Sequence, residues 1–162
     1  ERDLFRAARK QVPESRLFFN NNANDILAIA DAMMVGELEY RKENYEIAFN
    51  HLETAVQLND NLYYTEPWAW MHPPRHALGA LLLEQGHVEK AEQVYRADLG
   101  IDKNLARPLQ HPNNVWGLHG YLECLQRTDQ IIEAKGIQES LNSALALSGE
   151  IITSSCYCRH HH

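Results

Sequence analysis

A helix–turn–helix pattern that occurs three times constrains the fold of this 162-residue chain more than any other feature. The clearest copy spans residues 77–95, where Gly79 lies within a first apolar helical stretch and Gly86 marks a turn. Ala91 and Tyr95 then fall four residues apart, on one face of a second helix. A hairpin of two helices is therefore the expected local structure.

The pattern keeps its register along the chain. Equivalent positions carry three alanines 43 residues apart and three glycines 43 and 41 residues apart, namely Ala48, Ala91 and Ala134, and Gly36, Gly79 and Gly120. Repetition at a fixed period is typical of stacked structural units. The sequence thus predicts an all-α fold of stacked antiparallel helix hairpins over about residues 26–58, 74–100 and 114–147. A non-helical tail over 148–159 is expected to follow.

These hairpins resemble the tetratricopeptide repeat family, whose unit is a helical hairpin of about 34 residues. The first hairpin carries the resemblance through Gly36, Tyr45, Ala48, Leu52 and Ala55. The period here exceeds 34 because long connections follow the first and second hairpins. The resemblance implies one α-solenoid domain of about three repeats over residues 1–159. It also implies a concave groove that binds a peptide, a protein or a small ligand.

The family's groove is built mostly from the first helix of each hairpin. The resemblance therefore assigns seven residues to the groove: Asp31, Val35, Glu39, Arg75, Glu84, His119 and Glu123. Their acidic share favours a basic or amine-bearing partner. Cys124 is expected to be a small core residue.

Charge and composition narrow the classes of partner. The net charge is −7 and no basic block occurs, which argues against nucleic acid or an anionic membrane as the main partner. Three cysteines without a spaced framework favour a reducing, cytoplasmic compartment. The first residue is Glu1, so we expect a fragment of a longer chain. The three histidines at 160–162 are interpreted as a tag remnant.

Two pairs of residues could bind a metal ion. His72 and His76 are four residues apart at an expected helix start, and one helical turn would place them on the same side. Cys156 and Cys158 are separated by one residue, and thiolates combined with imidazoles suit copper or zinc. The alternatives are that His72 and His76 are capping or groove residues, and that the tail cysteines bind nothing or form a strained disulfide with each other.

A tail folded back along the groove would join these pairs into one site. Cys156 or Cys158 would then meet His72, His76, or another histidine such as His111 or His119. An open coordination position on the metal would allow hydrolytic or redox chemistry. The competing hypothesis for function is therefore a metal-dependent enzyme, or the C-terminal part of one, with one copper or zinc ion. Its catalytic residues are not indicated by the sequence.

A third candidate feature is the aromatic connection after the first hairpin. Its residues could line a ligand pocket together with side chains from the later hairpins: Glu66, Trp68, Trp70, Arg75, Trp116 and His119. Arg75 could bind a carboxylate there. Alternatively, the aromatic side chains only fill the space between two hairpins. A binding scaffold, a metal-dependent enzyme and a purely structural segment all remain open at this level.

Overall fold

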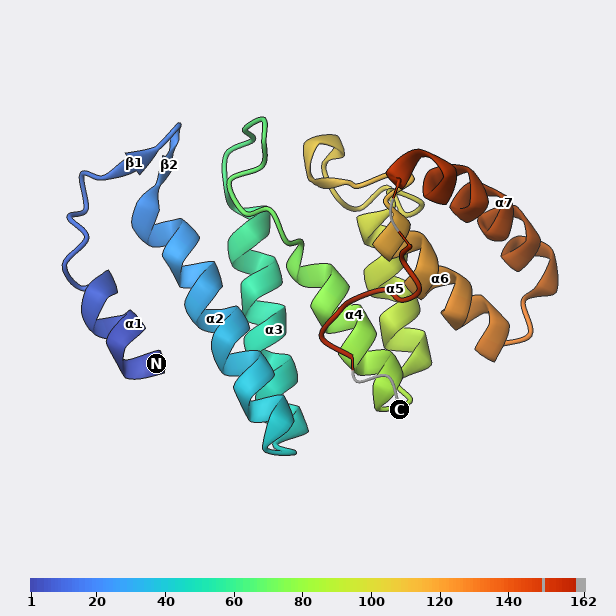
Figure 1. Cartoon of the computed structure of the whole chain (residues 1–162), viewed down its shortest axis with the longest axis horizontal. Coiled ribbons are helices and arrows are strands. Elements are labelled where there is room, and N and C mark those ends of the chain that lie inside the picture. The colour runs from blue at the N-terminus through green and yellow to red at the C-terminus, as the bar shows by residue number, and fades with distance from the viewer. Residues whose placement is uncertain (150, 160–162) are drawn as a thin grey trace. The chain divides into compact units, whose positions relative to one another are not determined.

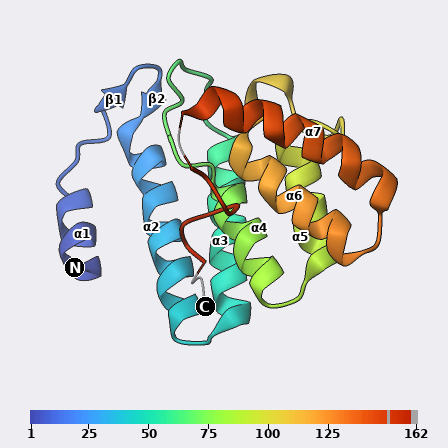
Figure 2. The same ribbon diagram turned by 45° about the vertical axis from the view of Figure 1, so that its right-hand side comes forward.

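The computed structural model describes residues 1–149 and 151–159. The chain divides into two compact units, 1–74 and 75–162, each of which is described by itself. The elements are shown in Figure 1, and in a turned view in Figure 2. In chain order they are α1 (Arg2–Arg9), β1 (Leu17–Phe18), β2 (Asn21–Asn22), α2 (Ala23–Arg41), α3 (Tyr45–Asp60), α4 (Pro74–Glu84), α5 (Val88–Asp98), the 3-10 helix η1 (Arg107–Leu109), α6 (Val115–Arg127) and α7 (Ile131–Ser148).

The first unit is built on the pair of helices α2 and α3. A Cβ atom placed at Gly36 would lie 2.8 Å from Cγ of Leu52 and 3.3 Å from the carbonyl oxygen of Ala48. Glycine therefore lets α2 approach α3 closely. The buried residues of this pair are Ile29, Ala32, Met33, Val35, Tyr40, Ala48, Leu52 and Ala55. Their helical spacing gives each of the two helices an apolar face.

A run of asparagines precedes α2 and forms both a short strand pairing and the cap of the helix. Phe18 pairs with Asn21 in a short antiparallel ladder between β1 and β2. The N-cap of α2 is Asn22, whose side chain accepts a hydrogen bond from the backbone N–H of Asn24. Asparagine and aspartate are both common caps, so the sequence predicts Asn24 or Asp25 as the cap of this helix. That prediction is wrong by two or three residues, because the cap is Asn22, which is also the last residue of β2.

In the second unit, the ring of Tyr95 on α5 fills the space left by two glycines. A Cβ atom at Gly79 of α4 would lie 2.5 Å from the ring, and one at Gly120 of α6 would overlap it. Tyr95 is fully buried, as are Cys124 and Leu125 of α6. Two of the repeated glycines thus leave the space that one aromatic ring fills. Cys124 is a core residue, as predicted from the sequence.

The predicted and observed helices agree closely. The chain is mostly helical with packed helix pairs. Turns separate the helices around residues 42–44, 85–87 and 128–130, and the second of these contains Gly86 as predicted. The described part of the tail, 151–159, contains no helix or strand. None of the described helices is both long and apolar enough to cross a membrane. The expected tag remnant at 160–162 lies outside the described residues.

Candidate functional site

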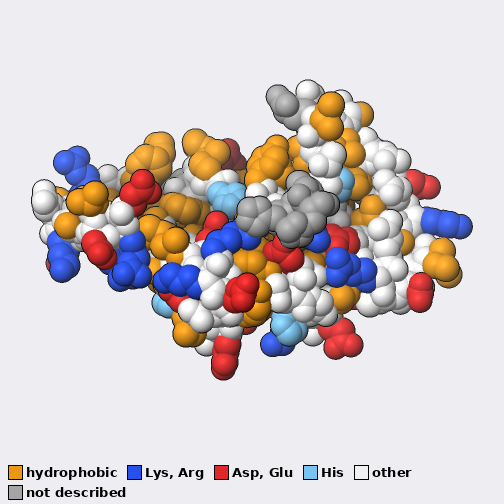
Figure 3. Space-filling view, turned by 60° about the horizontal axis from the view of Figure 1, so that its bottom comes forward, with side chains coloured by type: hydrophobic (Ala, Val, Ile, Leu, Met, Phe, Trp, Pro, Cys, Tyr) orange, Lys and Arg blue, Asp and Glu red, His pale blue; other side chains and the backbone are white. Residues whose placement is uncertain are grey.

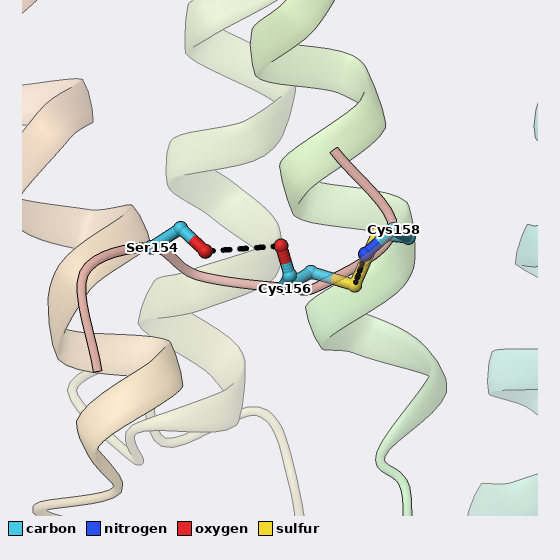
Figure 4. The surroundings of a disulfide bond; sticks show 3 residues. All are labelled: Ser154, Cys156 and Cys158. Atoms are coloured by element: carbon cyan, nitrogen blue, oxygen red, sulfur yellow. Dashed lines mark hydrogen bonds between the residues drawn. A yellow bond between two sulfur atoms is a disulfide. The ribbon is translucent and has the colours of Figure 1, made fainter. Parts of the chain in front are cut away.

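The C-terminal tail lies on the helices of its own unit, and this contact is the candidate site. Figure 4 shows the tail running from α6 towards α4, with Ser154, Cys156 and Cys158 labelled. Ser155 and Cys156 are 1% and 2% exposed, whereas Ile151 and Tyr157 are 90% and 78% exposed. The middle of the tail is therefore buried although it forms no regular secondary structure.

Three residues on one face of α6 hold the tail. Trp116, His119 and Glu123 are three and four residues apart, so their side chains lie in one row along the helix. Nε2 of His119 lies 2.8 Å from the carbonyl oxygen of Ile152. A carbonyl oxygen can only accept, so this nitrogen must carry the proton. The contact therefore fixes the backbone of the tail rather than a particular side chain.

An ion pair holds the end of the tail. The guanidinium of Arg159 donates to both carboxylate oxygens of Glu123, at 2.5 and 3.2 Å. Burial opposes the charged form of Arg159, but the hydrogen bond and the charge of Glu123 outweigh it and raise its pKa. Glu123 also accepts from Arg127, 2.5 Å away and one helical turn further along α6. The carboxylate thus faces two cations, and both its oxygens are used.

The segment between these two anchors is folded tightly. Cys156 and Cys158 form a disulfide, and the hydroxyl of Ser154 donates to the carbonyl oxygen of Cys156 over 3.1 Å (Figure 4). The backbone N–H of Cys158 lies 3.1 Å from Sγ of Cys156. The ring of Tyr157 meets that of Trp116 edge to face, with centroids 4.7 Å apart. The tail therefore presents small groups to the helices and one aromatic ring to Trp116.

Beneath the tail, the hydroxyls of Tyr95 and Ser155 are both buried. Neither hydroxyl has a hydrogen-bond partner of regular geometry among the described residues, although the Ser155 side chain lies close enough to Tyr95 to lower the pKa of its phenol. Burial raises the pKa of Tyr95 strongly, and Ser155 and Arg159 only partly oppose this. The phenol therefore stays neutral at any physiological pH and serves as the floor of the site.

A second buried cluster joins three residues of the same unit. Asp98, at the end of α5, lies 2.9 Å from Nε2 of His76 and 2.7 Å from Nδ1 of His111. Both ring nitrogens must donate, because an ionised carboxylate only accepts. Burial acts to raise the pKa of Asp98, but the hydrogen bonds from His111 and His76 outweigh it and lower the pKa to about 2. The cluster fastens the connection that carries His111 to α4 and α5.

The four predicted metal ligands have different surroundings. His76 faces Asp98, and Cys156 and Cys158 are bonded to each other, so in this form their sulfurs are not thiolates. His72 belongs to the first unit and lines a pocket there. In the described part of the chain, no group of three or more histidine, cysteine or acidic side chains is arranged to hold a metal ion.

The predicted ligand-binding residues also separate. Trp116 and His119 contact the tail, whereas Arg75 is buried in the second unit. Glu66 accepts a hydrogen bond from the Tyr64 hydroxyl within the first unit's connection. Two aromatic residues of that connection also belong to the first unit, namely Trp68, which is 37% exposed, and Trp70.

Sequence reasoning missed Arg159 and Asp98 as members of these two clusters. The spacing of Trp116, His119 and Glu123 was a usable signal for one helical face. Nothing in the sequence pairs Arg159 with Glu123, because 36 residues separate them. Comparison of the chain with protein-family models, with curated proteins and with solved structures found no match.

Proposed function

We propose that the second unit is a binding module for an extended peptide, and that the C-terminal tail occupies the peptide site. The observation that carries this proposal is the tail itself, a non-helical segment held by α6 through its backbone, one ring and one cation. Backbone contacts give affinity without sequence preference, and the flanking side chains add specificity. The module then fits the tetratricopeptide-like scaffold of about three repeats that we infer from the repeated hairpins.

The contacts define the chemistry of the peptide that would compete with the tail. Ser154, Ser155 and Cys156 are buried, so this part of the site accepts small side chains. Trp116 then offers an aromatic face, and Glu123 offers a carboxylate. A suitable partner is therefore an extended segment of small residues followed by an aromatic and a basic residue. This agrees with the basic partner expected from the sequence.

A peptide supplied separately tests the proposal. The full chain carrying Tyr157→Ala and Arg159→Gln has a weakened tail but an intact α6. We expect a fluorescein-labelled peptide of residues 151–159, in its disulfide form, to bind this variant and to raise the fluorescence anisotropy. The unaltered chain should bind at least about tenfold more weakly, because its own tail competes at an effective concentration near the millimolar range.

The matched control is the same peptide with Arg159→Gln, which cannot pair with Glu123. It should bind the weakened-tail chain several-fold more weakly. The proposal is rejected if neither chain binds the peptide, or if the control peptide binds equally well.

The alternative of a metal-dependent enzyme remains a prediction from the sequence, and no contact described above favours it. Copper or zinc at His72, His76, Cys156 and Cys158 would require both sulfurs as thiolates. Elemental analysis of the reduced, untagged chain after dialysis tests it. About one metal ion per chain, lost on changing both cysteines to serine, would support that alternative.

The face shown in Figure 3 carries acidic and basic side chains interspersed with hydrophobic ones. We keep the expectation of a protein or peptide partner rather than nucleic acid or a membrane. The cytoplasmic location likewise stays a prediction.

A further inference from the structure

The first unit contains a pocket of about 740 Å³ that the proposed peptide site does not use. This volume lies within the range of small-molecule sites, about 300–1,000 Å³. The pocket is lined by Gln11, Val12, Pro13, Arg16, Phe18, Ala23, Ile26, Leu27, Ala69, Trp70, Met71 and His72. Nine of these twelve residues are apolar, and none is acidic. All twelve belong to the first unit.

Asparagine side chains hold the walls of this pocket in place. Asn21 is 2% exposed and bonds the backbone of Tyr63 twice, as donor and as acceptor, at 2.8 Å each. This ties the short hairpin to the connection that carries Trp70. Asn22 and Asn24 donate to the carbonyl oxygens of Glu14 and Val12 on the segment after α1. The hairpin and the start of α2 are thus fastened to the segment just before them and to a connection 42 residues away. We infer that the pocket is preformed, as ligand sites usually are.

Two residues that line the pocket, Trp70 and Arg16, carry a polar group without a partner among the described residues. The indole N–H of Trp70 is buried without a hydrogen-bond acceptor among the described residues. Such a group is costly to leave unpaired, so an acceptor brought by a ligand would stabilise the bound state. Arg16 is exposed and makes no ion pair with any described residue. The nearest acidic residue in sequence, Glu14, lines a different cavity beside Arg6 and Arg9.

We propose that this pocket binds a small amphipathic carboxylic acid. Its apolar body would contact Phe18, Ile26 and Leu27, and its carboxylate would face Arg16. The charge of the lining selects this class, because a carboxylate complements the guanidinium and meets no acidic neighbour. A carboxylate oxygen is also an acceptor of the kind that the Trp70 N–H lacks.

A comparison of dodecanoate with dodecanol separates the contribution of the charged head to binding from that of the apolar body. Both are used well below the concentration at which the acid forms micelles. We expect dodecanoate to bind the full chain with one site by calorimetry, and dodecanol to bind about tenfold more weakly or not at all. Arg16→Gln should weaken the binding of dodecanoate about tenfold, which is the loss expected for a charge-assisted hydrogen bond. It should leave the affinity for dodecanol unchanged. Trp70→Phe should weaken the binding of dodecanoate, because it removes the indole N–H but keeps an aromatic ring in the wall of the pocket.

Lys10→Gln is the matched control, since Lys10 precedes the same segment but lines the other cavity. It removes the same charge and should leave dodecanoate binding unchanged. Arg16 is exposed, so its substitution should not alter the urea midpoint, which confirms folding of the variant. The assignment is overturned if dodecanoate does not bind, if dodecanol binds as tightly, or if Arg16→Gln and Lys10→Gln have equal effects. A preference for an apolar peptide over the acid would likewise overturn it.

Discussion

Gly120 of α6 lies against the ring of Tyr95 on α5, at a distance that leaves no room for a methyl group. Tyr95 is fully buried and Gly79 bounds the ring as well. The ring therefore cannot move away from a side chain at position 120. The same ring forms the floor beneath Ser155, so packing of the helices and seating of the tail depend on one contact.

Gly120→Ala should destabilise the protein. The substitution improves helix propensity by about 1 kcal/mol, but overpacking against a fixed ring costs about 1–3 kcal/mol or more. We expect the cost of overpacking to exceed the gain in helix propensity, so the variant should unfold at a lower urea midpoint. Gly136→Ala on α7 is the matched control, because nothing lies within 4 Å of its added methyl group. That variant should be stabilised, and equal effects at both positions would contradict the packing argument.

Asp98→Asn should remove part of the protein's sensitivity to acid. The pKa of Asp98 is lowered from 3.8 to about 2 in the folded chain. Its stabilising contribution is therefore complete above the unfolded pKa and is lost as the pH falls towards 2, a difference of about 2 kcal/mol. At neutral pH the variant should lose about 3 kcal/mol, because His76 and His111 lose a buried anionic partner.

Urea unfolding at pH 2 to 7 measures both effects of the Asp98 change. Asp129→Asn is the control, since Asp129 is exposed and its left-handed backbone, with φ of 55°, suits asparagine equally well. It should leave the acid limb of the stability curve unchanged. An unaltered acid limb in Asp98→Asn would refute the assigned role.

His119→Ala should loosen the tail without unfolding the helices. It removes the hydrogen bond to the carbonyl oxygen of Ile152, whose loss corresponds to about 1 kcal/mol. We expect the amides of residues 153–158 to exchange with solvent about five- to tenfold faster, as followed by mass spectrometry. His119→Gln keeps an N–H donor and should restore much of the protection. If alanine and glutamine behave alike, the hydrogen bond does not hold the tail.

Changing Cys156 and Cys158 together to serine should also loosen the tail. The disulfide closes a very short loop, which restricts the free tail and favours the docked form by about 1–2 kcal/mol in the chain-entropy view. Amide exchange of the tail should rise, whereas the urea midpoint of the helices should stay the same. Cys124→Ser changes a fully buried core position. It should lower the urea midpoint of the helices and leave the amide exchange of the tail unchanged. A lower helix midpoint in the double variant would show that the tail is part of the core.

The helices could be predicted because their signals are local. The apolar face of α2 repeats every three or four residues, and the turn before α5 carries Gly86 with φ of 78°. Such features depend on neighbours within one or two helical turns. The cap of α2 was misplaced because Asn22, Asn24 and Asp25 are all good caps, and only the strand pairing chose among them.

The two candidate sites could be predicted only in part. The sequence indicated that the tail is non-helical and that Trp116, His119 and Glu123 lie along one helix. It did not join Arg159 to Glu123, or Asn21 to the backbone of Tyr63, because these pairs are 36 and 42 residues apart. His76 was interpreted as a possible metal ligand from its spacing to His72, whereas packing placed it against Asp98.

By itself, the sequence determined the number, order and apolar faces of the main helices, and the non-helical character of the tail. Short-range backbone hydrogen bonding and side-chain periodicity suffice for these. Only the tertiary structure decided that the tail lies on α6 and that Asp98 accepts hydrogen bonds from two histidines. It also decided that asparagine side chains fasten the segments around the pocket that Trp70 lines. Such contacts depend on chain closure over tens of residues, where many partners compete and packing selects among them.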